Sequence, residues 1–356
     1  MTLVAHSKLP TYDRLREEGE VIITPDRAIH QDIRELHIGL LNMMPDAALS
    51  ATERQFFRLV GGSNQIAQVY IHPFTLPELV RGEEASEYIA QYYETFEQIK
   101  AEGLDALIIT GANVTQPDLS HEAFWEPLNE VFDWAYQNVS SVLCSCLATH
   151  AVMQSRFGKK RQALASKRWG VFSHQVIDQQ HPLVRNANTR FDVPHSRFNE
   201  ISREQFEQAG MSVLVESQAA GVHLAVSEDL FRIVFFQGHP EYDTISLLKE
   251  FKREVSRFAR GYRDEYPPFP DNYFGEQVKA ILAEHGYQIK RARQRGLPLP
   301  AFPEDMVASS IHNTWRDSGA TVLNNWLGLV YRTTHFDRKG LFLDELDPEN
   351  PLGLRK

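Results

Sequence analysis

The stretch VSSVLCSCLATHAVMQSRFG, residues 139–158, decides the fold class. Its first half is an apolar run that ends at Cys144–Ser145. Residues Leu147 to Phe157 follow at once with the apolar spacing of a helix. A short apolar run that passes directly into a helix is typical of a buried strand in a parallel α/β sheet.

The same alternation extends on both sides of that stretch. Further apolar runs ending in turn residues are Leu36–Leu41, Gln65–Ile71, Ala106–Thr110, Val222–Val226 and Arg232–Phe236. Helical spacing appears between and after them at Ser50–Leu59, Glu83–Ala101, Glu122–Gln137 and Asp243–Arg260. Because such strands are covered on both faces by helices, we expect an α/β fold with a doubly wound, mostly parallel sheet.

Three segments are expected along the chain. Residues 1–35 are polar and without a sustained period, which predicts an N-terminal arm, and residues 36–260 form the α/β core. Within the core, Gly170–Pro194 has the β-branched and aromatic content of an inserted antiparallel segment. Residues 261–356 form a C-terminal extension, in which Thr314–Thr334 regains a helical period and is expected to pack on the core.

The amino-acid composition and net charge limit the kinds of molecule that we expect the protein to bind. The chain has 356 residues, with 37 Lys and Arg against 47 Asp and Glu, and a net charge of −10. This balance argues against nucleic acid as a partner, and no apolar run approaches the ~20 residues that span a bilayer. No signal-peptide pattern precedes the core, and the 2 cysteines lie too close together to link the fold. We therefore expect a cytoplasmic protein without a membrane or nucleic-acid partner.

Cys146 stands where an activated thiol would stand. It occupies the turn between the apolar run and the helix, with small residues at Cys144 and Ala148 on either side. A helix N-terminus favours a thiolate and offers free N–H groups to an oxyanion. Ser145 is a rival nucleophile without such neighbours, and both cysteines could instead be buried apolar filler.

A matching base follows another apolar run, in the sequence Gly238-His239-Pro240-Glu241. Ligands bind at the carboxyl ends of strands in such sheets, so His239 could take a proton from the thiol while Glu241 orients the imidazole. The alternative is that both residues have only a structural role and stabilise the start of the next helix. A third strand ends at Gly111–Ala112, a turn that can expose backbone amides to a ligand.

These stretches together resemble a family of homoserine O-acyltransferases that use a Cys–His–Glu triad, often called homoserine O-succinyltransferases. The resemblance runs through the motifs LHIGLLNMMP, ALIITGANV, VLCSC, KRWGV, PHSR and GHPEYD. It implies the flavodoxin-like fold that this family shares with class I glutamine amidotransferases. It also implies a homodimer.

The resemblance assigns roles to individual residues. Cys146 falls on the acyl-accepting thiol, His239 on the general base and Glu241 on its partner carboxylate. Substrate-contacting positions of the family fall on Lys167, Ser196 and Arg253, where two cations suit the carboxylate of homoserine. The sequence departs from the family after the nucleophile, where His150 lies about one helical turn on, and at Asp46–Arg54, which replaces a more basic loop.

The expected reaction is a ping-pong transfer from an acyl-CoA to the hydroxyl of L-homoserine, with backbone N–H groups near Leu147, Gly111 and Ala112 stabilising the oxyanion. Acyl-CoA is a substrate, and we expect no cofactor. We also expect no metal, because the 14 histidines show no short ligand spacing. A glutamine amidotransferase or peptidase, and a binding module with an oxidisable thiol, are the alternatives.

The acyl group is predicted from Thr115. In this family, a glutamate four residues after the glycine of the TGA turn accompanies acetyl transfer, and a glycine there accompanies succinyl transfer. Thr115 occupies that position and carries no charge to repel the carboxylate of a succinyl group. We therefore expect succinyl-CoA as the donor, with acetyl-CoA as the alternative.

Overall fold

The computed structural model describes residues 2–31, 33–62 and 67–355. Within them, an 11-stranded sheet has the order β2-β1-β4-β3-β5-β6-β11-β10-β9-β7-β8. Its strands are β1 (Thr2–Val4), β2 (Ile22–Ile23), β3 (Glu35–Leu41), β4 (Gln68–Phe74), β5 (Ala106–Ile109), β6 (Ser141–Ser145), β7 (Gln162–Val176), β8 (Arg190–Glu200), β9 (Ser212–Ser217), β10 (Gly221–Val226) and β11 (Ile233–Phe236). Neighbouring strands from β2 to β11 are parallel, and those from β11 to β8 are antiparallel.

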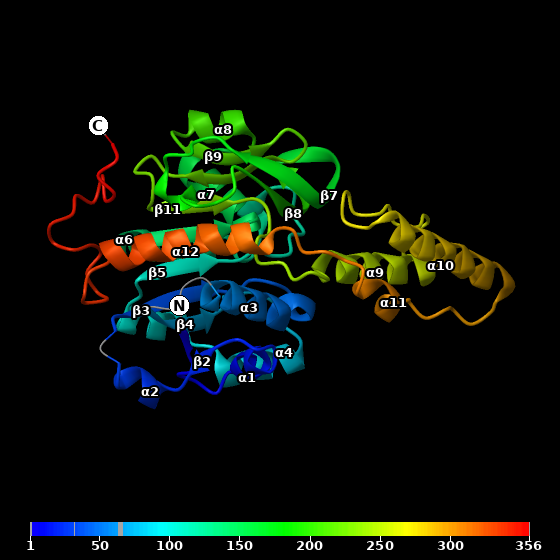
Figure 1. Cartoon of the computed structure of the whole chain (residues 1–356), viewed down its shortest axis with the longest axis horizontal. Helices are drawn as coiled ribbons and strands as arrows, with labels where there is room; N and C mark the ends of the chain where they lie inside the picture. Colours follow the sequence, from blue (N-terminus) through cyan, green and yellow to red (C-terminus); the bar gives the residue numbers. More distant parts are fainter. Residues whose placement is uncertain (1, 32, 63–66, 356) are drawn as a thin grey trace.

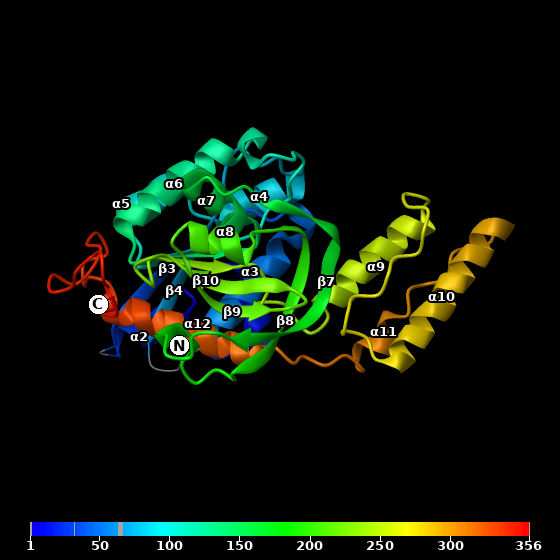
Figure 2. The ribbon, with the colours of Figure 1, turned by 90° about the horizontal axis from the view of Figure 1, so that it is seen from above.

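The described residues form 12 α-helices, several of which cover the two faces of the parallel part. They are α1 (Pro10–Glu17), α2 (Pro25–Ile29), α3 (Asp46–Gly61), α4 (Glu83–Tyr92), α5 (Phe96–Glu102), α6 (Trp125–Asn138), α7 (Leu147–Phe157), α8 (Arg203–Gln208), α9 (Ser246–Ala259), α10 (Glu276–Arg295), α11 (Glu304–Ala308) and α12 (Arg316–Thr333). Figure 1 shows α12 lying along the sheet, and Figure 2 shows α5, α6 and α7 on the opposite side from α12. No helix among the described residues is long and apolar enough to cross a membrane.

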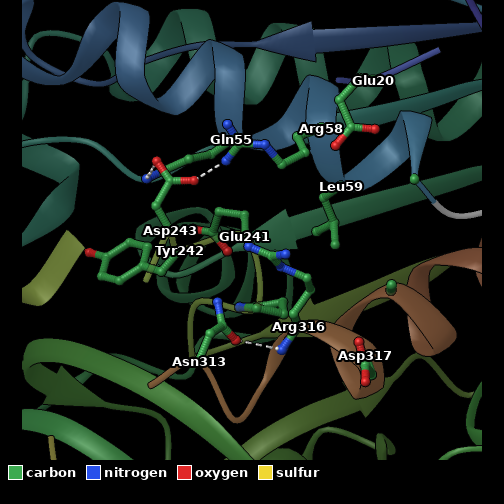
Figure 3. A pocket seen from close by; sticks show the side chains of 13 residues that line it. Glu20, Gln55, Arg58, Leu59, Glu241, Tyr242, Asp243, Asn313, Arg316 and Asp317 are labelled. Carbon is green, nitrogen blue, oxygen red and sulfur yellow. Dashed lines mark hydrogen bonds and ion pairs between the residues drawn. The ribbon is translucent and has the colours of Figure 1, made fainter. Parts of the chain in front are cut away.

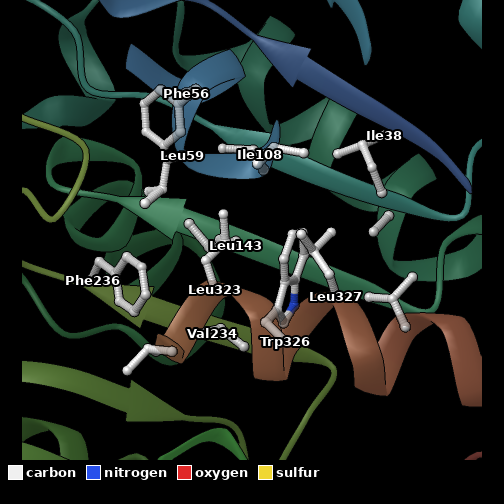
Figure 4. Packing of buried hydrophobic residues seen from close by; sticks show 14 of the residues in the cluster. Ile38, Phe56, Leu59, Ile108, Leu143, Val234, Phe236, Leu323, Trp326 and Leu327 are labelled. Atoms are coloured by element: carbon white, nitrogen blue, oxygen red, sulfur yellow. The ribbon is translucent and has the colours of Figure 1, made fainter. Parts of the chain in front are cut away.

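Alternation along each central strand fills two cores. On β5, Ala106 and Ile108 pack with α1, α3 and α12, whereas Leu107 and Ile109 pack with α5, α6 and α7. Figure 4 shows the first of these cores, where Trp326 and Leu323 of α12 reach the sheet. The doubly wound, mostly parallel α/β fold that the sequence predicts is thus confirmed.

Most predicted elements are present, with shifts at their ends. The helix Leu147–Phe157 has the predicted bounds, and the predicted helix Ser50–Leu59 lies within α3, which extends beyond it at both ends. The predicted strand Gln65–Ile71 begins outside the described residues and is observed as β4. The predicted single helix Glu83–Ala101 is wrong, because the chain turns between α4 and α5 and Thr95 forms a capping box that starts a new helix.

The predicted apolar run Val222–Val226 is a strand, β10, but its pairing is antiparallel to β11. A parallel crossover needs about a dozen residues or more, and the residues from Ser227 to Arg232 that join β10 to β11 are too few for one. The inserted segment Gly170–Pro194 covers the end of β7, the connection and the start of β8, and these two strands pair antiparallel as predicted.

The two ends of the chain differ from a simple arm and tail. The N-terminal segment contains β1 and β2, which extend the parallel edge beyond β4, so it forms part of the sheet. At the other end α12 packs on the core as predicted, while α9, α10 and α11 share a separate apolar cluster and project from one side (Figure 2). The division into segments at residues 36 and 261 stays a prediction.

Candidate active site

The turn between β6 and α7 holds Cys146 in a strained conformation. Its φ and ψ are 53° and −107°, values that non-glycine residues rarely adopt. The Cys146 backbone N–H donates to the carbonyl of Phe236 at 2.7 Å, which ties this turn to the neighbouring strand β11. The side chain is only partly buried. The strain and exposure at this residue match the expectation for a nucleophile at a strand-to-helix turn.

His239 and Glu241 follow the adjacent strand β11. The imidazole Nδ1 of His239 lies 2.7 Å from Oε1 of Glu241, and Cys146 lies close enough to the same imidazole to interact with it. Burial lowers the pKa of His239, but the Glu241 carboxylate and Cys146 outweigh it and hold this pKa well above its ordinary value. The three side chains predicted to act together are therefore in one place, and the surroundings of His239 favour its imidazolium form.

The rival groups lie elsewhere. Cys144 and Ser145 are buried within β6, and burial raises the pKa of the Cys144 thiol. The imidazole of His150 is buried, with Nε2 at 3.2 Å from the side-chain oxygen of Gln237, and burial lowers its pKa to about 3. Of these polar groups around the turn, only Cys146 combines exposure with a nearby base.

The loop after β11 is held close to β8. A Cβ at Gly238 would lie 2.5 Å from the Cγ1 of Val193, so only glycine fits this approach. The next residue, His239, donates its backbone N–H to the carbonyl of Pro194 at 2.8 Å. The PHSR motif of β8 thus positions the base.

Gly111 and Ala112 follow β5, on the other side of β6 from β11. A Cβ built on Gly111 would lie 3.7 Å from the Cβ of Cys146, so this turn lies directly against the thiol. Leu147 is the first residue of α7, where backbone N–H groups lack partners within the helix. All of the predicted oxyanion amides therefore belong to segments that border Cys146.

Comparison with known proteins gives the same identification as these motifs. The family model described as homoserine O-succinyltransferase matches residues 2–336. The chain belongs to this family.

Similar proteins match the chain over almost its whole length. It is 66% identical to the homoserine O-succinyltransferase of Nitrosococcus oceani, over 100% of this chain and 99% of that protein. For the protein of the same name in Allochromatium vinosum, the identity is 66% over 99% of each chain. A glutamine amidotransferase structure from Methylobacillus flagellatus is 12% identical, with a TM-score of 0.44, over 83% of this chain and 95% of that one.

Two of the three predicted substrate-contacting residues meet on a carboxylate of α9. The Nζ of Lys167, on β7, lies 3.1 Å from Oε2 of Glu250, and the hydroxyl of Ser196, on β8, donates to the same oxygen at 2.6 Å. Lys167 also lies over the ring of Trp169. Arg253 is one helical turn beyond Glu250, with 62% of its side chain exposed and its Nε 3.8 Å from Glu254.

Glu250 and Tyr242 were not predicted from the sequence. The Tyr242 ring stacks on His239 with centroids 4.3 Å apart, and its hydroxyl donates to Oε1 of Glu250 at 2.9 Å. Tyr242 thus connects the base to the cluster around Lys167. The HPEYD motif contained this signal, since an aromatic residue three positions after a base in a tight loop is a candidate for packing against it.

Thr115 is exposed, and a carboxylate already occupies its surroundings. Glu122 accepts the backbone N–H of Thr115 at 2.5 Å and its hydroxyl at 3.3 Å. The hydroxyl is therefore engaged within the chain. Arg161 donates to the carbonyl of Gln116 in the same loop at 3.0 Å, and its guanidinium lies close enough to Cys146 for a charge interaction. This half-buried cation was also missed by sequence reasoning.

A pocket of about 210 Å³ lies behind the base. Figure 3 shows Gln55 and Arg58 of α3 on one side, and Asn313 and Arg316 near the start of α12 on the other. Between them, Asp243 accepts from Arg54 at 2.6 Å and also pairs with Arg58. The lining includes Glu241 and Tyr242 but not Cys146, so this pocket borders the loop that carries the base and does not include the thiol. The ion pairs in the pocket hold the HPEYD loop on α3.

Proposed function

We propose that this chain transfers a succinyl group from succinyl-CoA to the hydroxyl of L-homoserine, in methionine biosynthesis, through an acyl thioester on Cys146. One observation carries this proposal: a partly buried, strained thiol that interacts with a buried His–Glu pair, in a chain that belongs to the homoserine O-succinyltransferase family over residues 2–336.

The first half of the reaction acylates the enzyme. His239 takes the proton of Cys146, and the thiolate attacks the thioester carbonyl to form a tetrahedral oxyanion. The N–H groups of Leu147 and of the Gly111–Ala112 turn donate to that oxyanion. Collapse breaks the bond to the CoA sulfur, which leaves with the proton from His239 and yields acyl-Cys146.

The second half transfers the acyl group. His239, now neutral, takes the proton of the homoserine hydroxyl, whose oxygen attacks the acyl-Cys146 carbonyl. Collapse of the second oxyanion breaks the C–S bond and returns the proton to Cys146 through His239. Throughout, Glu241 holds the imidazole by its Nδ1 and stabilises the imidazolium.

Lys167, Ser196 and Arg253 are the residues that we propose for homoserine binding. Lys167 and Arg253 provide cations for its carboxylate, and Ser196 provides a hydroxyl. Glu250 acts on this set as a positioning residue, because it holds Lys167 and Ser196 on one oxygen.

Arg161 is the group that we propose for the distal carboxylate of the succinyl donor. Its guanidinium lies near Cys146 and beside the loop that carries Thr115. This cation offsets the nearby Glu122, which has Thr115 as its hydrogen-bond partner. The carboxylate of a succinyl group would thus pair with the Arg161 cation, whereas an acetyl group has no carboxylate to pair with it.

Several further expectations belong to the same proposal. The steps above are proton transfers through His239 and attacks by the Cys146 thiolate and by homoserine itself, so we propose that the reaction needs no cofactor. The partners are then two small molecules, L-homoserine and an acyl-CoA. We also propose that the protein forms a homodimer and is located in the cytoplasm.

Donor kinetics test the proposal. We expect wild-type kcat/KM for succinyl-CoA to exceed that for acetyl-CoA by tenfold or more. Arg161→Gln should lose about 10- to 100-fold with succinyl-CoA, the worth of one charge-assisted hydrogen bond, and little with acetyl-CoA. Lys160→Gln is the control, because Lys160 is an adjacent, exposed cation paired with Asp118.

Thr115→Glu supplies the complementary test. It would place a second carboxylate beside Glu122, so succinyl transfer should fall more than acetyl transfer. Two results would contradict the proposed donor: a wild type that prefers acetyl-CoA tenfold, or a Thr115→Glu enzyme that keeps its succinyl preference. Release of ammonia from glutamine, without acyl transfer, would instead favour an amidotransferase.

A further inference from the structure

A cluster of His and Glu side chains lies on the parallel edge of the sheet, remote from Cys146. His6 follows β1, His72 is on β4, and Glu94 lies between α4 and α5, where it bridges to Phe74. Each offers one ligand atom, and these atoms lie within 4.8 Å of one another. Strands β3 and β5 separate β4 from β6, so this cluster is distinct from the proposed active site.

Hydrogen bonds around His37 determine which nitrogen of His72 carries a proton. The guanidinium of Arg338 has only donors, and its Nη1 lies 2.9 Å from Nδ1 of His37, so that nitrogen is an acceptor. Nε2 of His72 lies 2.9 Å from the same acceptor and must therefore carry a proton.

The opposite nitrogen of His72 then faces a carboxylate. Its Nδ1 lies 2.7 Å from Oε1 of Glu94. Since Nε2 already carries the proton of a neutral ring, Nδ1 would present a lone pair to a carboxylate oxygen, which is repulsive. A cation must lie between the two atoms. It is either a proton shared by the two side chains or a metal ion.

His6 is the third member of this cluster. Its Nδ1 lies 3.2 Å from the carbonyl oxygen of Val4, which can only accept, so Nδ1 carries the proton. In a neutral ring, the unprotonated nitrogen is then Nε2. The rings of His6 and His72 have centroids 4.8 Å apart.

We propose that His6, His72 and Glu94 bind a divalent transition-metal ion of the zinc type. Two imidazole nitrogens and a carboxylate are a common ligand set for zinc, with water or another group in the fourth position. Histidines that bind metal usually donate the other ring N–H to a carbonyl or another acceptor. His6 does so to Val4, and His72 does so to His37.

Binding requires only small movements of these side chains. Ligand atoms of a tetrahedral zinc ion lie about 3.3 Å apart for bonds of about 2.0–2.1 Å. The His72–Glu94 pair therefore opens slightly, and His6 rotates inward. The ion would link three segments that are far apart in sequence, namely the N-terminal segment, β4 and the α4–α5 connection. No short motif announces such a site, so its ligands escape a search for His spacing.

Metal titration of the full-length, chelator-treated protein tests this proposal. We expect one equivalent of Zn²⁺ to raise the unfolding temperature, and Co²⁺ to give a visible absorption band typical of nitrogen and oxygen ligands in a site of low coordination number. His72→Gln and Glu94→Gln should each weaken Zn²⁺ binding at least tenfold and abolish the Co²⁺ band. Their circular dichroism and acyl-transfer activity without metal show whether they fold.

Matched controls are available nearby. Glu97→Gln removes an exposed carboxylate from α5, and His30→Gln removes an exposed imidazole from the end of α2, and neither should affect binding. Absence of a stoichiometric Zn²⁺ or Co²⁺ signal in the wild type would overturn the proposal in favour of a proton between His72 and Glu94. Binding that survives in folded His72→Gln and Glu94→Gln variants would overturn it equally.

Discussion

Two poorly exposed carboxylates on either side of Tyr242 differ in how their oxygens are used. Glu241 has 5% of its side chain exposed, and its Oε1 contacts His239 while its Oε2 is buried without a hydrogen-bond partner among the described residues. Glu250 has 14% exposed, and both of its oxygens accept hydrogen bonds. Its partners are Tyr242 on Oε1, and Lys167 and Ser196 on Oε2.

The difference separates a carboxylate that tunes a base from one that holds a binding site together. The charge of Glu241 acts chiefly on His239, whose pKa it raises against the effect of burial. For Glu250, burial raises the pKa, but Lys167, Ser196 and Tyr242 outweigh burial and lower it. Glu250 is thus stabilised as an anion, and it fixes side chains from β7 and β8 against α9.

Glu241→Gln should have the largest effect. The amide keeps the shape but removes the charge that favours the imidazolium of His239, so kcat should fall about 10³- to 10⁴-fold with little change in KM. The pKa of His239 should also fall, which moves the pH–rate profile of acyl transfer. Wild type and variant are compared across pH, and a loss in kcat below tenfold would contradict the role of Glu241.

For the Glu241→Gln variant we also predict how the free energy of unfolding depends on pH. Because the pKa of His239 is raised in the folded protein, its contribution to the free energy of unfolding is fully present below its ordinary value of about 6.5. That contribution is lost as the pH rises through the folded value. The stability difference between wild type and Glu241→Gln, from urea unfolding, should therefore shrink from about pH 6 upward. A stability difference that does not change with pH would contradict the coupling between Glu241 and the pKa of His239.

Glu250→Gln should affect substrate binding more than chemistry. Loss of this charge leaves Lys167 unpaired in a mostly buried site, which costs about 3 kcal/mol in the free energy of unfolding. We expect KM for homoserine to rise tenfold or more, with kcat within about threefold. Glu276→Gln, which removes an exposed pair with Lys279, is the control. A fall in kcat with unchanged KM would remove the distinction between the two carboxylates.

Tyr242→Phe should have the smallest effect. It removes the hydroxyl donated to Glu250 but keeps the ring stacked on His239. One such hydrogen bond contributes about 1 kcal/mol, and Glu250 keeps its other partners. Steady-state kinetics should show kcat/KM within about tenfold of wild type. A larger loss confined to kcat would mean that the hydroxyl takes part in proton transfer.

Short-range patterns in the sequence were enough to predict the parallel centre of the fold. Apolar runs that end in turns located β3, β5, β6 and β11, and residues 147–158 carried the bounds of α7. Periodicity carries no information on pairing direction, so the antiparallel pairing of β10 was not visible. The capping box at Thr95 was readable, yet the continuous helical spacing of Glu83–Ala101 concealed it.

The site was predictable only where a motif marks it. Cys146 and His239 each directly follow a strand, so the sheet brings them together. Lys167 and Glu250 are 83 residues apart and meet only through the packing of α9 on β7 and β8, which no local pattern encodes. Arg161 likewise reaches the surroundings of Cys146 from the start of β7.

The most direct test of the account is the intact mass of the protein after rapid mixing with succinyl-CoA in the absence of homoserine. We predict one added succinyl group in the wild type and in Cys144→Ala, and none in Cys146→Ala. Addition of L-homoserine should remove the group and release O-succinylhomoserine. An adduct that maps to Cys144, or full turnover by Cys146→Ala without any adduct, would contradict the proposed acyl-Cys146 intermediate.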